Sequence, residues 1–139
     1  MKARYNLADA NRLLPLLRSI AAEIEERRAE RRRLTRLRDE LESAATPEGF
    51  SRALVEVDTQ QSEHRHAIDV ALHEFEGLGL SILRTNPLTV HIPGDTQRGP
   101  IVFCWQHGEE HIAHGHLEGE EDDPRRPLRV RAADGEAAA

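Results

Sequence analysis

Two long helical patterns fill the first half of the chain and leave few folds open to it. In residues 6–43, apolar side chains recur every three or four residues, which places them on one side of a helix. A second pattern of this kind spans residues 46–78, and it begins with Thr46 and Pro47, a pair typical of a helix start. Helices joined by so short a turn pack antiparallel, so the sequence predicts a long helical hairpin.

Two features interrupt the regularity of this hairpin. Pro15 lies within the first helix, where a proline costs about 3 kcal/mol because it removes a backbone hydrogen bond, so we expect a kink near Asn11. In the antiparallel pairing, Gln61 and His64 fall opposite residues 27–31, where arginines replace the apolar stripe. Both helices become polar at the same level, which predicts either a buried polar network or a loosened middle.

After Gly79 the pattern changes to short β-strands. Residues 86–117 form a predicted antiparallel β unit, and residues 118–139 a flexible tail that changes from acidic to rich in alanine and glycine. The predicted fold class is α+β, a long antiparallel helical hairpin followed by a small three-stranded β unit, in a single domain of residues 1–117. The expected strands cover residues 88–92, 101–106 and 111–117, with turns at residues 93–95 and 108–109.

The core of a single hairpin of this kind would be thin. Hydrophobic residues make up 38% of the chain, and the aromatic residues are only three Phe, one Trp and one Tyr. Val55 and Val70 lie outside the main apolar stripe of the second helix and need a second surface to cover them. We therefore expect a homodimer in which two hairpins form a four-helix arrangement.

Composition disfavours several classes of protein. No apolar run approaches the roughly 18 residues that a membrane span needs. The sole cysteine, Cys104, suits a reducing compartment, so we expect a cytoplasmic protein. A formal net charge of -6 disfavours nucleic acid as the main partner. The arginine-rich stretch of residues 27–38 is either a solvated helix face with glutamates one turn away or a surface that binds another macromolecule.

All eight histidines lie between positions 64 and 116, and neutral imidazole is the commonest metal ligand in proteins. In the third predicted strand, His114 and His116 alternate with small residues, so both point to the same face. His91 lies on the first predicted strand, which should pair nearby. A His-x-His strand joined by a third histidine resembles the three-imidazole sites that hold Zn or Fe with an open coordination position.

The second helix carries further candidate ligands. Glu63, His66, Asp69 and His73 follow one another at spacings of three, three and four residues and so share one helix face. Glu63 and His66 form the Glu-x-x-His pattern that carboxylate-bridged di-iron bundles use twice. Of these residues, His73 is the one best placed to complete a metal coordination shell whose other ligands come from the β unit.

A second interpretation of these residues needs no metal. Histidines in a polar, acidic strand pair are often surface residues, and His107 and His111, which flank the turn at residues 108–109, fit that description. Cys104 lies in the middle of a strand with no basic neighbour in the sequence, so we expect a buried structural thiol rather than a nucleophile, and a soft metal ligand is the remaining alternative.

Several short motifs follow one another along the chain. They are Asn11-Arg12-Leu13-Leu14-Pro15, the passage of residues 79–93, Cys104-Trp105, Gly108-Glu109, His116 and Arg126-Pro127-Leu128. Their order resembles that of the uncharacterised prokaryotic domain-of-unknown-function 2203 (DUF2203) family over nearly the whole chain. Only His116 coincides with a histidine of that family. His91 stands where the family usually has an acidic residue, Gly115 where tryptophan is common, and Leu117 where an acid is usual. The resemblance implies an architecture and no activity.

Two functions from different classes are consistent with these patterns. The first is a metalloprotein that holds Fe or Zn and binds a small molecule at an open position, with oxygen, peroxide, nitric oxide or hydrolytic chemistry. The second is a non-enzymatic dimeric adaptor that binds a macromolecule through its arginine-rich helix. The sequence leaves open whether the protein is an enzyme. The candidate metal ligands are His91, His114, His116, His73, His66, Glu63 and Asp69.

Overall fold

The computed structural model is an α+β structure that describes residues 4–44, 47–120, 125–130 and 137–138. The chain divides into two compact units. The sheet unit comprises Met1–Ala21 and Glu74–Ala139, and the helical unit comprises Ala22–His73. The predicted helix start at Thr46 lies outside the described residues, as do residues 121–124, 131–136 and 139 of the predicted tail.

The first helical pattern forms two helices rather than one. Helix α1 covers Leu7–Arg12 and helix α2 covers Leu14–Ser43, with the interruption at Leu13. Pro15 explains the break, because its missing N–H is the donor that would have bonded the carbonyl of Asn11 one turn earlier. The kink expected near Asn11 is therefore an interruption two residues further on.

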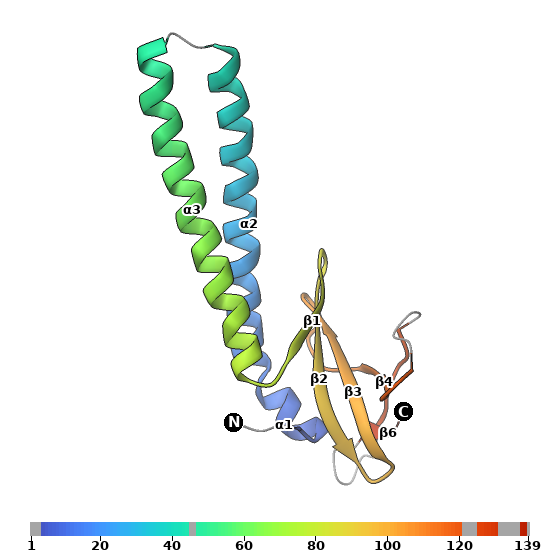
Figure 1. Ribbon diagram of the computed structural model, residues 1–139. Coiled ribbons are helices and arrows are strands. Elements are labelled where there is room, and N and C mark those ends of the chain that lie inside the picture. Colours follow the sequence, from blue (N-terminus) through green and yellow to red (C-terminus); the bar gives the residue numbers. More distant parts are fainter. Residues whose placement is uncertain (1–3, 45–46, 121–124, 131–136, 139) are drawn as a thin grey trace. The chain divides into compact units, whose positions relative to one another are not determined.

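Four antiparallel strands form the main sheet, in the order β1-β2-β3-β4 (Figure 1). The prediction of three strands is wrong because it lacks β1. This edge strand is mostly exposed, and its pairing is irregular between Ile82 and Arg84, so it has no clear apolar alternation. A separate pair joins Arg129–Val130 (β5) to Ala137–Ala138 (β6). The main strands are β1 (Ser81–Thr85), β2 (Leu88–Thr96), β3 (Gly99–Gln106) and β4 (His114–Leu117).

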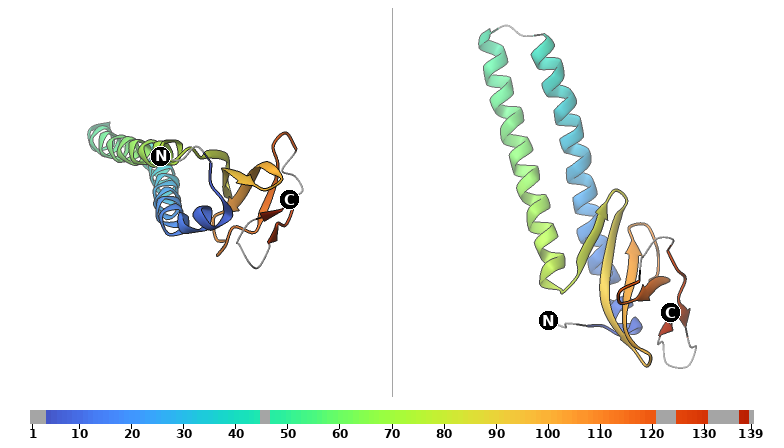
Figure 2. Two further views of the ribbon diagram at one scale, coloured as in Figure 1. Left: turned by 90° about the horizontal axis from the view of Figure 1, so that it is seen from below. Right: turned by 45° about the vertical axis from the view of Figure 1, so that its right-hand side comes forward.

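Strand β2 continues through the turn expected at residues 93–95, and it forms with β3 the long curved ribbon seen in Figure 2. Pro93 fits within a strand here because its carbonyl accepts a hydrogen bond from the N–H of Tyr5, on the side away from β3. The missing proline N–H points to that same side, so the pairing with β3 is undisturbed. At Gly94, a Cβ atom would lie only 2.3 Å from Cε2 of Phe103, so glycine allows the Phe103 ring to pack against the strand.

The register of the sheet separates an apolar face from a polar one. Val90 pairs with Trp105 and Ile92 with Phe103, and all four are fully buried. Because side chains alternate along a strand, their neighbours point to the opposite face. We call that opposite face the imidazole face, and it is defined by His91, Cys104, His114 and His116.

In the helical unit, α2 is accompanied by α3, which covers Pro47–Gly77. The two helices are antiparallel, because Arg27 contacts His64 whereas Arg38, further along α2, contacts Asp58, which comes earlier in α3. The polar middle is a hydrogen-bonded network rather than a loosened layer. Gln61 Nε2 donates to the carbonyl of Arg31 at 3.3 Å and to Thr35 Oγ1 at 2.9 Å. Among the described helices, none is both long and apolar enough to cross a bilayer.

Candidate functional site

The imidazole face is built by strand pairing in the sheet unit. His91 on β2 lies directly opposite Cys104 on β3, and Cys104 lies directly opposite His114 on β4. Paired residues of an antiparallel sheet point to the same side, so these three side chains form a row across the strands. His116 lies two residues beyond His114 and faces the same way, as the alternation in the sequence predicts.

Two of the predicted ligands meet above the central strand. The imidazole rings of His91 on β2 and His116 on β4 approach to 5.3 Å between ring centres, at an interplanar angle of 64°. Both side chains must lean over β3 to do so, because β3 separates their strands. His116 is 5% exposed, and His91 is partly buried. The structure therefore gathers two imidazoles in a largely water-excluded position.

The third sheet histidine is directed to a carboxylate. His114 Nδ1 lies 3.3 Å from Glu109 Oε2, an ion-pair distance without the alignment of a good hydrogen bond. Glu109 is held from the other side by Arg125, whose Nη1 and Nη2 donate to its two carboxylate oxygens at 2.9 and 2.7 Å. This bidentate pair fixes the carboxylate next to the imidazole.

Glu109 also organises the turn after β3. Its Oε1 accepts a hydrogen bond from the N–H of Gln106 at 2.7 Å, and its carbonyl accepts one from Trp105 Nε1 at 3.0 Å. Burial alone would raise the pKa of Glu109, but the hydrogen bonds from Arg125 and Gln106 outweigh it and lower that pKa below its ordinary value. The Glu109 carboxylate likewise raises the pKa of Arg125, so the pair is ionised at neutral pH.

Cys104 is buried, as expected, and it has a basic neighbour that is distant in the sequence. Arg125 Nε lies 3.4 Å from Cys104 Sγ, and Arg125 Nη2 donates to the Cys104 carbonyl at 3.0 Å. These residues are 21 positions apart, so the contact depends on the path of the chain after β4. A guanidinium beside the sulfur repels a metal cation, so Cys104 is a poor candidate ligand.

Residues 126–128 reach the sheet through backbone pairing with β4. The N–H of Gly115 donates to the carbonyl of Arg126 at 2.9 Å, and the N–H of Leu128 donates to the carbonyl of Ala113 at 2.8 Å. Residues 126–128, which belong to the predicted tail, thus lie along β4. This pairing positions Arg125 beside Glu109 and Cys104, two contacts that the sequence analysis missed. Their only signal in the sequence is that Gly108-Glu109 and Arg126-Pro127-Leu128 are among the motifs on which the resemblance described above rests.

Close packing explains why the residue between the two β4 histidines is a glycine. A Cβ atom at Gly115 would lie 2.7 Å from the carbonyl oxygen of Val102 and 3.0 Å from Cδ2 of Leu128. No larger side chain fits there without movement of the backbone. Gly115 therefore allows the close approach of Leu128 to β3 and β4.

The helical candidates lie in the other unit. Glu63, His66, Asp69 and His73 are all exposed on α3. His73 Nδ1 donates to the backbone carbonyl of Asp69 at 2.7 Å, which is an intrahelical contact. These residues share a helix face as predicted, but their side chains are not drawn together.

Neither set forms a complete metal site in this arrangement. Within the described parts of the chain, no three side chains of His, Cys, Asp or Glu are placed so that they could hold one metal ion. The sheet unit does bring His91 and His116 together, and His114 is in the same row as His91 with its imidazole next to Glu109. What the imidazole face offers chemically is two adjacent imidazoles, a third that is oriented by a carboxylate, and partial exclusion of water.

The chain matches the model of one known protein family. The family model described as "Uncharacterized conserved protein (DUF2203)" matches residues 4–128, which include both units and the whole imidazole face. The comparisons with curated proteins and with solved structures give no match.

Proposed function

We propose that this chain, which belongs to the DUF2203 family of uncharacterised conserved proteins, binds one transition-metal ion, Fe or Zn, at the imidazole face of its sheet. His91 and His116 would be the first two ligands and His114 the third. Three imidazoles leave a coordination position open to a small molecule. A metal bound in this way supplies Lewis-acid chemistry, or redox chemistry if it is iron, toward oxygen, peroxide, nitric oxide or a hydrolysable bond.

The observation that carries the proposal is the approach of His91 to His116. Their ring centres are 5.3 Å apart. Two imidazoles bound to one tetrahedral ion have ring centres about 5 Å apart, given a metal–nitrogen distance of about 2.1 Å. The separation of the two ring centres therefore matches that expected for imidazoles that share an ion.

The surroundings of His114 support its role as the third ligand. Metal-binding histidines commonly direct one ring nitrogen to a carboxylate, which fixes the ring and leaves the other nitrogen for the metal. Glu109 lies in that position relative to His114 Nδ1 and is itself held by Arg125. Binding a metal through Nε2 would then require a turn of the His114 side chain toward the other two imidazoles.

A second, weaker set of candidate metal ligands lies exposed on the surface of α3 and consists of Glu63, His66, Asp69 and His73.

We also propose that the protein is a cytoplasmic homodimer. Val55 and Val70, which are 63% and 46% exposed on α3, support the dimer because water-exposed valines of this kind are stabilised by contact with a second chain. The single cysteine supports the location.

The test is the metal content of protein purified without a histidine tag. We expect about one Fe or Zn per chain by elemental analysis, and a higher melting temperature after loading because a ligand that binds only the folded state stabilises it. The double variant His91→Ala/His116→Ala should lose both effects. The matched control is His107→Ala/His111→Ala, which removes two histidines outside the proposed ligands and should keep both.

Two outcomes would contradict this assignment. Stoichiometric metal in His91→Ala/His116→Ala would remove these residues from the site. A wild-type chain that neither contains a transition metal nor is stabilised by Fe(II) or Zn(II) would refute the metalloprotein proposal itself.

A further inference from the structure

The exposed side of α3 carries two pairs of metal ligands on successive turns. Glu63 and His66, the first pair, are three residues apart, and Asp69 and His73, the second pair, are four apart. The members of each pair are therefore neighbours on the helix surface. Ligands at these helical spacings share an ion in di-iron bundles and in zinc metalloproteases. All four side chains are exposed, so an ion can reach them.

The imidazole of His73 is already oriented in a way that suits metal binding. Its Nδ1 donates to the backbone carbonyl of Asp69 at 2.7 Å, so in the neutral ring Nε2 carries the lone pair. Histidine ligands commonly donate their second ring nitrogen to a carbonyl or a carboxylate, because that contact fixes both the ring and the tautomer. The second pair thus combines a carboxylate with an oriented imidazole.

One chain cannot complete a metal site from these residues. Glu63 and His73 are ten residues, about 15 Å, apart along the helix, so the two pairs cannot reach the same ion. In agreement, the described residues of the chain include no group of three candidate ligands placed to hold a metal. Zinc takes four ligands, so each pair supplies half of a coordination shell. The other half must come from outside the chain.

A second copy of α3 supplies the missing pair. The two pairs lie at equal distances on either side of Ile68, so an antiparallel helix pair centred there places Glu63 of one copy opposite His73 of the second copy. Each first pair then meets a second pair, and twofold symmetry gives two identical four-ligand sites. A parallel pair would set every acid beside its own copy, whereas the antiparallel pair leaves Glu56 and Asp58 beyond the overlap.

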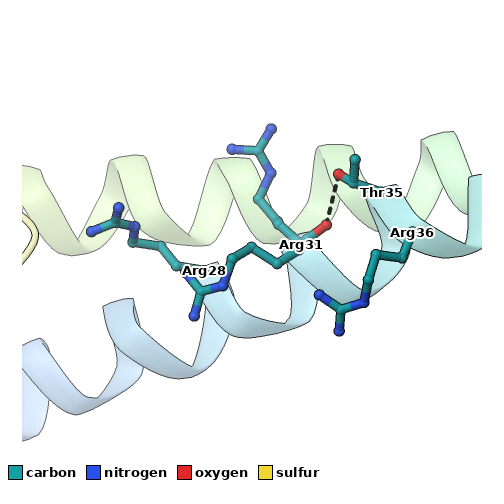
Figure 3. A pocket seen from close by; sticks show the side chains of 5 residues that line it. Arg28, Arg31, Thr35 and Arg36 are labelled. Carbon is teal, nitrogen blue, oxygen red and sulfur yellow. Dashed lines mark hydrogen bonds between the residues drawn. The ribbon is translucent and has the colours of Figure 1, made fainter. Parts of the chain in front are cut away.

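The charge of α3 explains why such a contact needs a cation. Residues 55–73 contain four acids and a single arginine, Arg65. The arginines of the hairpin are concentrated on α2 instead, and Figure 3 shows three of them, Arg28, Arg31 and Arg36. Two copies of the acidic side of α3 repel each other. A divalent ion held by carboxylates of both copies converts that repulsion into attraction.

We propose that two copies of the chain share zinc ions between their α3 helices, at two equivalent sites per dimer, and that zinc thereby tightens the dimer. This inference rests on the proposed homodimer and not on the imidazole face. Val70, which is 46% exposed and lies between the members of the second pair, belongs to the same contact. Because all ligands are at the surface, these sites fill when excess zinc is added and empty on dialysis against a chelator. Metal retained through purification belongs to the imidazole face.

Sedimentation velocity of the full-length chain without a histidine tag tests the proposal. The dissociation constant of the dimer is compared in EDTA and in excess Zn(II). Zinc at ten times the dissociation constant of each site would tighten the dimer about a hundredfold, so we expect at least about tenfold. His91→Ala/His116→Ala should keep this response because it leaves α3 unchanged. The matched control His107→Gln/His111→Gln removes two histidines outside α3 and should also keep it.

Two double variants at exposed positions test whether the copies share each ion. Glu63→Gln/His66→Gln removes the first pair, and Asp69→Asn/His73→Gln removes the second. Neither variant alone should respond to zinc, because each of its sites keeps only two ligands. An equimolar mixture should regain about tenfold tightening, because a mixed dimer has one complete site. Circular dichroism checks that both variants keep their helices.

The variant Glu63→Gln/Asp69→Asn separates metal binding from general damage to the contact. In EDTA it should associate at least as strongly as the wild type, because it removes four like charges from the dimer contact. In zinc it should tighten less than about threefold, because each site loses both carboxylates. A disrupted helix surface would instead weaken association in EDTA as well.

Four outcomes would overturn the proposal. A dimer that zinc does not tighten would leave the homodimer standing without shared ions, whereas a chain that is monomeric with and without zinc would refute the homodimer too. A zinc response lost in His91→Ala/His116→Ala would assign the effect to the imidazole face. A mixture of the two double variants that does not respond would exclude ligands shared between the copies.

Discussion

At the scale of single residues, Glu109 connects three parts of the sheet unit. Its carboxylate accepts hydrogen bonds from Arg125 and from the N–H of Gln106, and it lies beside His114. Its side chain is 24% exposed and that of Arg125 is 21% exposed, so water screens this pair less than the surface pairs of α2. A change at Glu109 should therefore be measurable as a change in stability.

We predict that Glu109→Gln lowers the free energy of unfolding by about 1–3 kcal/mol at neutral pH, because it leaves the Arg125 guanidinium without its charged partner. The pKa of Glu109 is lowered in the folded state, so its contribution is fully present above the ordinary value of about 4.5 and is lost as pH falls through the folded pKa. The difference between wild type and variant should accordingly shrink in acid. Urea unfolding as a function of pH measures it.

The control for this experiment is Glu110→Gln, at the adjacent exposed position. It removes the same charge without the contacts to Arg125 and Gln106, and its stability should stay within about 0.5 kcal/mol of wild type. A Glu109→Gln variant that is no less stable than Glu110→Gln would contradict the structural role of the Glu109–Arg125 pair.

At the scale of elements, the short helix α1 is attached to the segment before β4 by one side chain. Asn11 Oδ1 accepts a hydrogen bond from the N–H of Ile112 at 3.0 Å, and Asn11 Nδ2 donates to the carbonyl of Leu7 at 3.0 Å. Both contacts lie within the sheet unit, and Ile112 is buried. They give a physical role to the first residue of the motif Asn11-Arg12-Leu13-Leu14-Pro15.

We predict that Asn11→Ala destabilises the protein by about 1–3 kcal/mol, because the buried N–H of Ile112 loses its acceptor. Asn11→Asp keeps an acceptor oxygen for that N–H and loses only the donor to Leu7, so its effect should be smaller. Arg12→Ala, at the neighbouring position with a side chain that is 77% exposed, should be nearly neutral. Thermal unfolding compares the three variants, and equal melting temperatures for Asn11→Ala and Arg12→Ala would contradict the prediction.

At the scale of the whole molecule, the exposed valines of α3 allow a test of the proposed homodimer. We predict that Val70→Glu, at a position that is 46% exposed, splits a wild-type dimer into monomers, because it places a charge in an apolar contact. Sedimentation velocity at micromolar concentration measures the change. Leu83→Glu, at a position that is 41% exposed on β1 of the sheet unit, is the matched control and should remain dimeric.

Two possible results of this experiment bear on the dimer and on the proposed metal site. A wild-type chain that sediments as a monomer would disprove the dimer. A Val70→Glu monomer that retains its full metal content would keep the dimer and confine the proposed metal site to one chain.

Features that follow from a regular local pattern were predictable from the sequence, and features without such a pattern were not. Apolar spacing of three and four residues predicts α2 and α3, because it reports only how neighbouring residues share a helix face. Alternation likewise predicts that His114 and His116 point to the same side of their strand. The edge strand β1 was not predictable because it is mostly exposed and irregularly paired, so it has no clear apolar alternation. The continuation of β2 through Pro93 was not predictable because it depends on Tyr5, which is distant in the chain.

The sequence by itself determined the helical patterns and the presence of histidines on one face of a strand, since each of these follows from the order of adjacent residues. Only the tertiary structure decided which side chains meet. His91 and His116 approach each other across β3 because β2 and β4 both pair with that strand. Arg125 reaches Cys104 and Glu109 because residues 126–128 pair with β4. Contacts of this kind depend on strand order and side-chain direction, which no local pattern contains.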